Sequence, residues 1–146
     1  MQEERLQEQW RSMAGAVLRT EQGGMVKVCY PGIARGASGP DFKDAVLETD
    51  GRRLVCGDVE VHVRASDWYA HGHDSDPAYD NVVLHVLGQL GCWSTTRTSS
   101  GREVSVAVLG LADEWDRMET LPCAGLYATD TDRVTAALRA AGHERL

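Results

Sequence analysis

The sequence predicts an α+β domain of mixed α/β character, in which a central mixed β-sheet is flanked by an N-terminal and a C-terminal helix. Two observations carry this prediction. Apolar residues recur at helical spacing near both ends of the chain. Between them lie several alternating segments rich in β-branched residues, separated by turns rich in glycine and proline. Terminal helices with strands between them are typical of an α+β or mixed α/β domain.

The composition indicates a single folded domain over residues 1–146. The chain is 42% hydrophobic and 25% charged, and it is long enough to bury a core. Its formal net charge of −7 argues against non-specific binding of nucleic acid. A metal site that acts on a nucleic-acid phosphodiester stays open, because the cation supplies the positive charge. No apolar run approaches the roughly 20 residues of a membrane span, so we expect a cytoplasmic protein that binds no membrane.

The N-terminal segment predicts an amphipathic helix over residues 3–19. Its apolar face consists of Leu6, Trp10, Met13, Val17 and Leu18. Two glycines at 23 and 24 end the helix, and residues 25–30 alternate in the manner of a first strand. A glycine-rich loop over residues 31–39 follows.

The central prediction is a β-hairpin of residues 42–49 and 52–64 around an Asp50-Gly51 turn. A two-residue turn places Thr49 opposite Arg52 and Asp41 opposite Glu60. Directly opposed residues lie on the same side of a sheet. The second strand alternates, with valines on one face and polar residues on the other.

The remaining elements follow in order along the chain. We predict a helical turn at 66–69, a loop at 71–79, a strand at 81–87, a strand at 103–111 and a closing helix at 129–141. His85 alternates with Val83 and Leu87 inside its strand, so we expect a buried, supporting histidine.

The hairpin brings Asp41, Glu60 and His62 to one face. Two carboxylates paired across a hairpin favour a cation between them, and Mg²⁺ or Mn²⁺ is the expected choice. Asp41 and Glu60 are then the metal ligands, and His62 orients or deprotonates a bound water. Asp41, Glu60 and His62 are the predicted catalytic residues.

A second polar group lies in the loop that follows the hairpin. His71, His73 and Asp80 are predicted to form the rim of the site or to contact the substrate. Together with His62 they also offer an alternative, a zinc-dependent hydrolase with a histidine-rich centre. A further alternative is a non-catalytic module in which the polar cluster is a hydrogen-bond network and the partner is another protein.

The central motif resembles that of the PD-(D/E)xK nuclease superfamily. Pro40-Asp41 matches its first half and Glu60-Val61-His62 its second, with His62 where the superfamily has lysine. This resemblance implies a restriction-endonuclease-like fold, metal-dependent cleavage of a phosphodiester, and a helical acid for which Glu4 and Glu8 are the candidates.

A longer series of motifs resembles a bacterial family of uncharacterised proteins, known as a domain of unknown function. The resemblance runs from about Trp10 to the C-terminus. It is carried by the motifs GPDF, GDVEVH, SDW, HGH and DPAYDNVVLHV, which begin at residues 39, 57, 66, 71 and 76. Family members are typically longer, so the chain is expected to be an N-terminal part or a short version.

Overall fold

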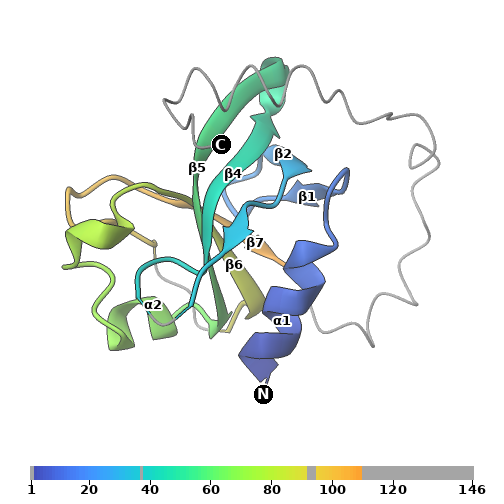
Figure 1. Cartoon of the computed structure of the whole chain (residues 1–146). Helices are drawn as coiled ribbons and strands as arrows, with labels where there is room; N and C mark the ends of the chain where they lie inside the picture. Colours follow the sequence, from blue (N-terminus) through green and yellow to red (C-terminus); the bar gives the residue numbers. More distant parts are fainter. Residues whose placement is uncertain (1, 37, 92–94, 110–146) are drawn as a thin grey trace, which may run out of the picture.

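The computed structural model describes residues 2–36, 38–91 and 95–109, most of which belong to one curved β-sheet and its connections (Figure 1). The strands are β1 (Val17–Arg19), β2 (Met25–Tyr30), β3 (Ile33–Ala34), β4 (Phe42–Thr49), β5 (Arg53–Arg64), β6 (Val82–Gln89) and β7 (Ser105–Val108). The helices are α1 (Gln2–Arg11) and α2 (Asp67–Ala70), with 3₁₀ turns at Asp50–Arg52 and Pro77–Tyr79. None of the described helices is long and apolar enough to cross a membrane.

The predicted fold class was wrong, because the described chain is mostly β and its sheet is nearly closed like a barrel. The strand order is β1-β2-β4-β5-β6-β7, with β3 paired to β4. The two ends of this order approach each other through a bridge between Thr20 and Ala107. A sheet that curves back on itself is not a central sheet between helices, so the restriction-endonuclease-like architecture is also corrected. The predicted helix at 129–141 lies outside the described residues.

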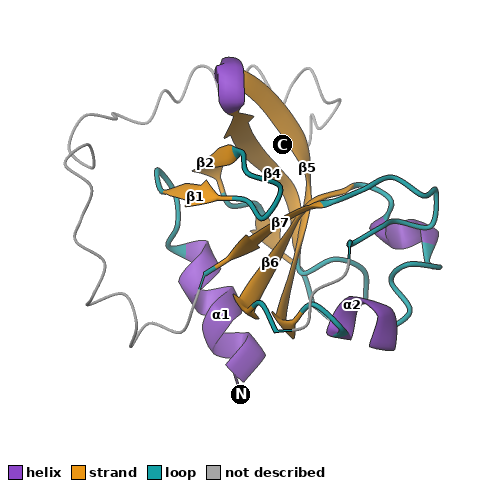
Figure 2. Cartoon of the chain, turned by 180° about the vertical axis from the view of Figure 1, so that it is seen from behind, coloured by secondary structure: helices purple, strands orange, loops and turns teal. Residues whose placement is uncertain are grey.

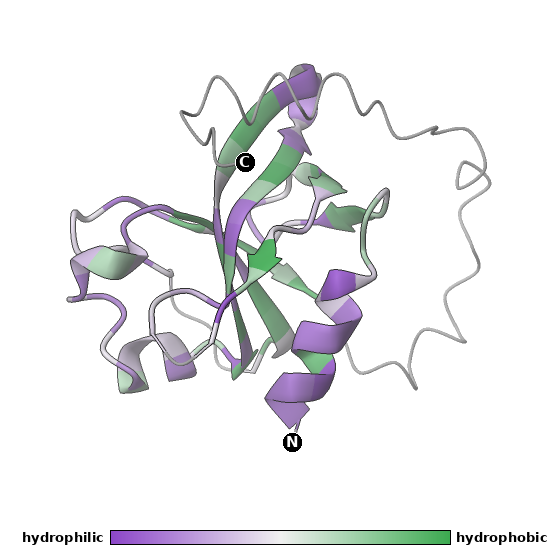
Figure 3. Ribbon diagram, viewed as in Figure 1, coloured by the Kyte–Doolittle hydropathy of each residue, from purple (hydrophilic) through white to green (hydrophobic). Residues whose placement is uncertain are grey.

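The sheet encloses the main hydrophobic core, and α1 contributes one face to it. Leu6 and Trp10 are fully buried in the same cluster as valines of β2, β5 and β6. The rest of α1 is hydrophilic, as its colour in Figure 3 shows. The indole of Trp10 also donates a 2.9 Å hydrogen bond to the carbonyl of Pro31. This packing fixes α1 against the strands that carry the polar site.

The predicted N-terminal helix was too long. The helix ends at Arg11, and Gly15 adopts a left-handed φ of 86° before the chain enters β1. Val17 and Leu18 were assigned to the apolar face of the helix because their spacing fits it. Both are also good strand residues, and pairing with β2 decides in favour of the sheet.

The β4–β5 hairpin was predicted correctly, but its turn has three residues. The Asp50–Arg52 turn shifts the nearby pairing by one residue, to Thr49 opposite Arg53. A β-bulge between Phe42 and Ala45 then shifts the register again, so that Phe42 lies opposite Val59. The two shifts cancel, and Asp41 reaches Glu60 as the simpler register predicted.

The parallel pairing of β5 with β6 has a direct consequence for the site. Parallel neighbours need a long connection over one face of the sheet, and here residues 65–81 provide it with α2 and the Pro77–Tyr79 turn. Figure 2 shows this connection and α1 on opposite sides of the β5–β6 pair. The connection therefore covers the sheet face on which β5 places its polar side chains.

The side chain of Gln22 helps to join the two ends of the sheet. The amide of Gln22 donates to the carbonyl of Val104 at 3.2 Å and accepts from the backbone N–H of Val106 at 3.1 Å. Gln22→Ala is expected to lower the free energy of unfolding by about 1–3 kcal/mol, because both backbone groups lose a partner. Urea denaturation measures the change. Glu21→Ala is the control. Its hydrogen bond to Val106 comes from the backbone N–H, which alanine keeps, so its free energy of unfolding should stay near that of wild type.

Candidate metal centre

Three polar side chains lie buried on the face of the β5–β6 pair that the connection covers. Glu60 and His62 alternate along β5 with core valines, and His85 lies beside Glu60 in the register of β6. Glu60 is 5% exposed, His62 1% and His85 0%. Burying such groups is costly unless each has a partner, so their partners define the site.

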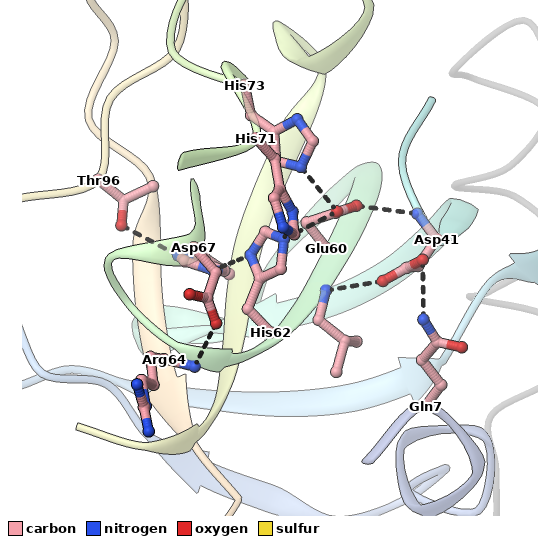
Figure 4. A network of polar contacts seen from close by, with 11 residues as sticks. Gln7, Asp41, Glu60, His62, Arg64, Asp67, His71, His73 and Thr96 are labelled. Carbon is pink, nitrogen blue, oxygen red and sulfur yellow. Dashed lines mark hydrogen bonds and ion pairs between the residues drawn. The ribbon is translucent and has the colours of Figure 1, made fainter. Parts of the chain in front are cut away.

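Asp41 joins Glu60 at the start of β4, as predicted (Figure 4). The backbone N–H of Asp41 donates to Oε2 of Glu60 at 3.0 Å. In return, Oδ2 of Asp41 accepts from the backbone N–H of Val61 at 3.1 Å, and Oδ1 accepts from the amide of Gln7 at 3.0 Å. The two acids are thus held side by side by β4, β5 and α1.

The environment of Asp41 disfavours its charge. Burial raises the pKa of Asp41 to about 7, and the charge of Glu60 adds to the increase, although the hydrogen bonds from Val61 and Gln7 oppose it. A carboxyl group that holds a proton near neutral pH has the property of a general acid.

Three histidines converge beside Glu60. His62 Nε2 lies 3.1 Å from His71 Nδ1. Oε1 of Glu60 lies 3.4 Å from His62 Nε2 and 3.2 Å from His73 Nε2. His62 and His73 are buried, whereas His71 is exposed and closes the cluster on its outer side. His71 and His73 follow α2 in the β5–β6 connection, and that connection bends back over β5.

Behind His62, a chain of hydrogen bonds runs into the interior. His62 Nδ1 contacts His85 Nε2 at 2.9 Å, and His85 Nδ1 contacts Oγ1 of Thr96 at 3.0 Å. Burial and the neighbouring histidines lower the pKa of His62 to about 2. Burial, with a smaller effect of His73, lowers the pKa of His85 to about 3. Both rings are therefore neutral at pH 7.

Aromatic rings form the wall around these histidines. Tyr79 stacks on His73 with ring centroids 3.8 Å apart, and Trp68 packs against both His73 and His85. Burial raises the pKa of Tyr79 to about 12, with Glu60 as the next cause. These ring contacts help to bury His73 and His85, which are 8% and 0% exposed.

Asp80, predicted as part of the rim, is engaged in another part of the connection. Its carboxylate accepts hydrogen bonds from the hydroxyl of Ser99 at 2.8 and 2.9 Å and from the backbone N–H of Ser100 at 3.2 Å. These bonds, that of Ser99 first, lower the pKa of Asp80. Asp80 thus secures the turn before β7, and its place at the rim of the site stays a prediction.

The helix contributes residues to the site that the sequence reasoning missed. Gln7 contacts Asp41, and Glu3 lies one turn earlier on the same helix face. The pKa of Glu3 is raised, chiefly by burial; electrostatic interaction with His71 lowers this pKa, and interaction with Glu60 raises it. Glu3 therefore lies within electrostatic reach of the cluster.

The helical acids considered earlier, Glu4 and Glu8, are both exposed. Spacing from the buried Leu6 and Trp10 would have favoured Glu3 and Gln7, because residues three or four apart share a helix face. Thr96 was also missed, and no pattern in the sequence marks it.

The structure separates two possible metal sites. Among the described residues, His62, His71 and His73 offer three ring nitrogens that all lie within 4.8 Å of one another, an arrangement that could hold a metal ion. Asp41 and Glu60, the predicted ligands, do come together, but both oxygens of Asp41 already accept hydrogen bonds from the protein. The three histidines are therefore better placed to bind a metal ion than the pair Asp41 and Glu60.

Comparison with known proteins places the chain among relatives but assigns no activity. A family model described as "Protein of unknown function (DUF2851)" matches residues 3–119. This match includes every residue of the site described above. The comparisons with curated proteins and with solved structures gave no match.

Proposed function

Because the chain belongs to the DUF2851 family of proteins of unknown function, its activity has to be inferred from its site, and we propose that it is a divalent-metal-dependent hydrolase of phosphoric esters. The observation that carries the proposal is the convergence of three histidine nitrogens beside a buried carboxylate. His62, His71 and His73 hold the metal, and Glu60 lies against two of these ligands.

The spacing of the donor atoms supports the assignment of metal ligands. With Zn–N bonds of about 2.0–2.1 Å, neighbouring ligand atoms in a tetrahedral zinc site lie roughly 3.3–3.4 Å apart. The contact between His62 Nε2 and His71 Nδ1 is 3.1 Å. These two nitrogens therefore need to move only a few tenths of an ångström to bind one ion. A set of imidazoles favours Zn²⁺ over Mg²⁺, which prefers oxygen ligands.

The neighbouring acids supply the remaining chemistry of a hydrolase. Three protein ligands leave a zinc ion with a position for water, and the metal lowers the pKa of that water. Oε1 of Glu60 lies 3.4 Å from His62 Nε2 and 3.2 Å from His73 Nε2, a suitable place to accept the water's proton. Asp41, with its pKa raised to about 7, is suited to protonate a leaving oxygen.

A second candidate is a nuclease that binds Mg²⁺ or Mn²⁺ at Asp41 and Glu60, with nucleic acid as its substrate. The observation that favours it is the pairing of the two acids, in which Oε2 of Glu60 accepts from the backbone N–H of Asp41 at 3.0 Å and the charge of Glu60 helps to raise the pKa of Asp41. A hard cation between the two carboxylates would replace the proton that this pair otherwise binds. In this candidate the acids of Pro40-Asp41 and Glu60-Val61-His62 are the metal ligands.

Metal content and hydrolysis test the proposal together. Purified protein is analysed for bound metal, stripped with a chelator and titrated with Zn²⁺, Co²⁺ and Mn²⁺. Hydrolysis of bis(p-nitrophenyl) phosphate, DNA and RNA is then followed with each metal. We expect Zn²⁺ or Co²⁺ to bind and to activate hydrolysis. His71→Ala is expected to lower the metal affinity by on the order of 100-fold or more, since an exposed ligand is lost.

Asp74→Ala is the matched control, because Asp74 is exposed in the same connection and should leave metal affinity unchanged. Binding of Mn²⁺ but not Zn²⁺, with no effect of His71→Ala, would favour the second candidate. A wild-type protein that binds none of these metals and hydrolyses none of these substrates would contradict both candidates and favour a non-catalytic module.

A further inference from the structure

We propose that His85 and Thr96 are positioning residues that hold the proton of His62 on Nδ1 and so present Nε2 to the metal. This inference rests on the metal site proposed above and adds two residues that bind no metal themselves. Its basis is the buried chain His62 Nδ1···His85 Nε2 (2.9 Å) and His85 Nδ1···Thr96 Oγ1 (3.0 Å).

Each contact in this chain holds one proton. Two ring nitrogens 2.9 Å apart form a hydrogen bond only if one carries hydrogen and the other a lone pair. With neutral rings, the chain has two consistent patterns. In one, Thr96 donates to His85, His85 donates to His62, and His62 carries its proton on Nε2. In the other, His62 donates from Nδ1 to His85, and His85 donates from Nδ1 to Thr96.

Metal binding is compatible with only the second pattern. His62 Nδ1 faces His85, whereas Nε2 faces His71 and Glu60, so Nε2 is the atom available to the metal. A ligating nitrogen needs its lone pair, which moves the proton of His62 to Nδ1. His85 must then accept with Nε2 and donate with Nδ1, and the hydroxyl of Thr96 is the acceptor that makes this possible.

The acceptor at the end of the chain is held in place. Thr96 is fully buried, and its carbonyl accepts a 2.9 Å hydrogen bond from the backbone N–H of Val104. The next residue, Arg97, accepts at its carbonyl a 2.9 Å hydrogen bond from the indole of Trp68. The side chain of Trp68 also packs against His85. The chain from His62 therefore ends on a fixed hydroxyl.

A pair of substitutions at Thr96 tests the inference. Thr96→Val keeps the shape but removes the acceptor, so the metal-competent pattern leaves the Nδ1–H of His85 buried without a partner. We expect Thr96→Val to bind Zn²⁺ and Co²⁺ about 10- to 100-fold more weakly than wild type. Thr96→Ser restores the hydroxyl and should bind within about threefold of wild type. In the middle of the hydrogen-bond chain, His85→Gln keeps an acceptor for His62. It should therefore bind Zn²⁺ and Co²⁺ more tightly than His85→Leu.

A spectroscopic measurement separates positioning from packing. With ¹⁵N-labelled histidine, the zinc-loaded wild-type and Thr96→Ser proteins should show a protonated Nδ1 and a metal-shifted Nε2 for His62. Thr96→Val should lose this signature at zinc concentrations that saturate wild type. If Thr96→Val is folded and binds Zn²⁺ like wild type while His71→Ala does not, the inference is wrong and the metal site stands. If wild type itself binds no metal, the proposed function fails.

Discussion

At pH 8, metal-free Asp41→Asn is expected to be more stable than the wild-type protein by about 2–4 kcal/mol, even though it loses a residue of the site. The pKa of Asp41 rises from an ordinary 3.8 to about 7 on folding. The folded state therefore binds the proton more tightly than the unfolded state. Each pKa unit corresponds to about 1.4 kcal/mol, and the side chain keeps some contact with solvent, which reduces the full value.

The stability gained by Asp41→Asn depends on pH because the binding of a proton to Asp41 is linked to folding. A carboxyl group with a raised folded pKa costs nothing below pH 3.8, where both states are protonated. Its cost grows as the pH rises towards 7 and is constant above that value. Asparagine carries no charge, and its carbonyl accepts from the backbone N–H of Val61. Its amino group faces the amide of Gln7, which turns to accept. The substitution thus keeps the hydrogen bonds and removes the charge.

Urea denaturation at pH 8, 6 and 4.5 checks this prediction. The advantage of Asp41→Asn should be largest at pH 8 and should shrink as the pH falls. Asp74→Asn, at an exposed position, is the control and should behave like wild type at each pH. Equal stability of Asp41→Asn and wild type at pH 8, or an advantage that does not change with pH, would contradict the origin proposed for the pKa shift.

The buried histidines have the opposite pH dependence, which is why the comparison has to be made at each pH. The pKa values of His62 and His85 are lowered to about 2 and about 3. Below their ordinary value of 6.5 the unfolded state takes up protons that the folded state does not, so these two residues lower the stability as the pH falls. Both wild type and Asp41→Asn share this loss, and it cancels in their difference.

A cost of this size at a buried acid is informative about the site. Proteins seldom keep an unfavourable charge in the interior where a neutral residue of the same shape would fit, except where the charge serves a function. Asp41 and Glu60 are also held next to each other by backbone hydrogen bonds from both strands. A stabilising Asp41→Asn that abolishes hydrolysis would show the trade between stability and activity that is typical of active sites.

The sequence predicted the parts of the site that depend on local pattern. Alternation along β5 placed Glu60 and His62 on one face, and the hairpin placed Asp41 beside them. His85 was expected to be buried and supporting, and it contacts His62 from behind. These inferences needed only the two-residue period of a strand and one tight turn. Even there, the correct register at Asp41 came from a longer turn and a bulge whose shifts cancel.

The parts that failed depend on contacts between distant residues. Closure of the sheet rests on contacts of Thr20 with Ala107 and of Gln22 with Val106, both more than 80 residues later in the chain. Curvature of this kind has no short-range signature. The meeting of His71 with His62 depends on the path of the β5–β6 connection, which the pattern of polar residues does not determine. Sequence reasoning therefore identified the histidines as candidates but could not choose between a rim and a metal centre.

Glu60→Gln is expected to lower the rate of hydrolysis by about 10²- to 10⁴-fold, the usual contribution of a positioned general base. The glutamine has the same shape, and its carbonyl can keep the hydrogen bond from the backbone N–H of Asp41, which Glu60 accepts at 3.0 Å. It cannot accept a proton from a metal-bound water at neutral pH. Steady-state kinetics on bis(p-nitrophenyl) phosphate, with a Zn²⁺ titration of the same sample, measures both effects.

The metal titration is the decisive half of this experiment, because the two candidate sites use Glu60 differently. If His62, His71 and His73 hold the metal, Glu60→Gln should keep its Zn²⁺ affinity within about 10-fold of wild type while activity is lost. If Asp41 and Glu60 hold a hard cation instead, metal affinity and activity should fall together, since an amide is a poor replacement for a carboxylate ligand. Glu8→Gln, on the exposed side of α1, should change neither. The ring nitrogens of His62, His71 and His73 converge within 4.8 Å of one another, and His85 holds the ring of His62 through Nδ1, so we expect the first result.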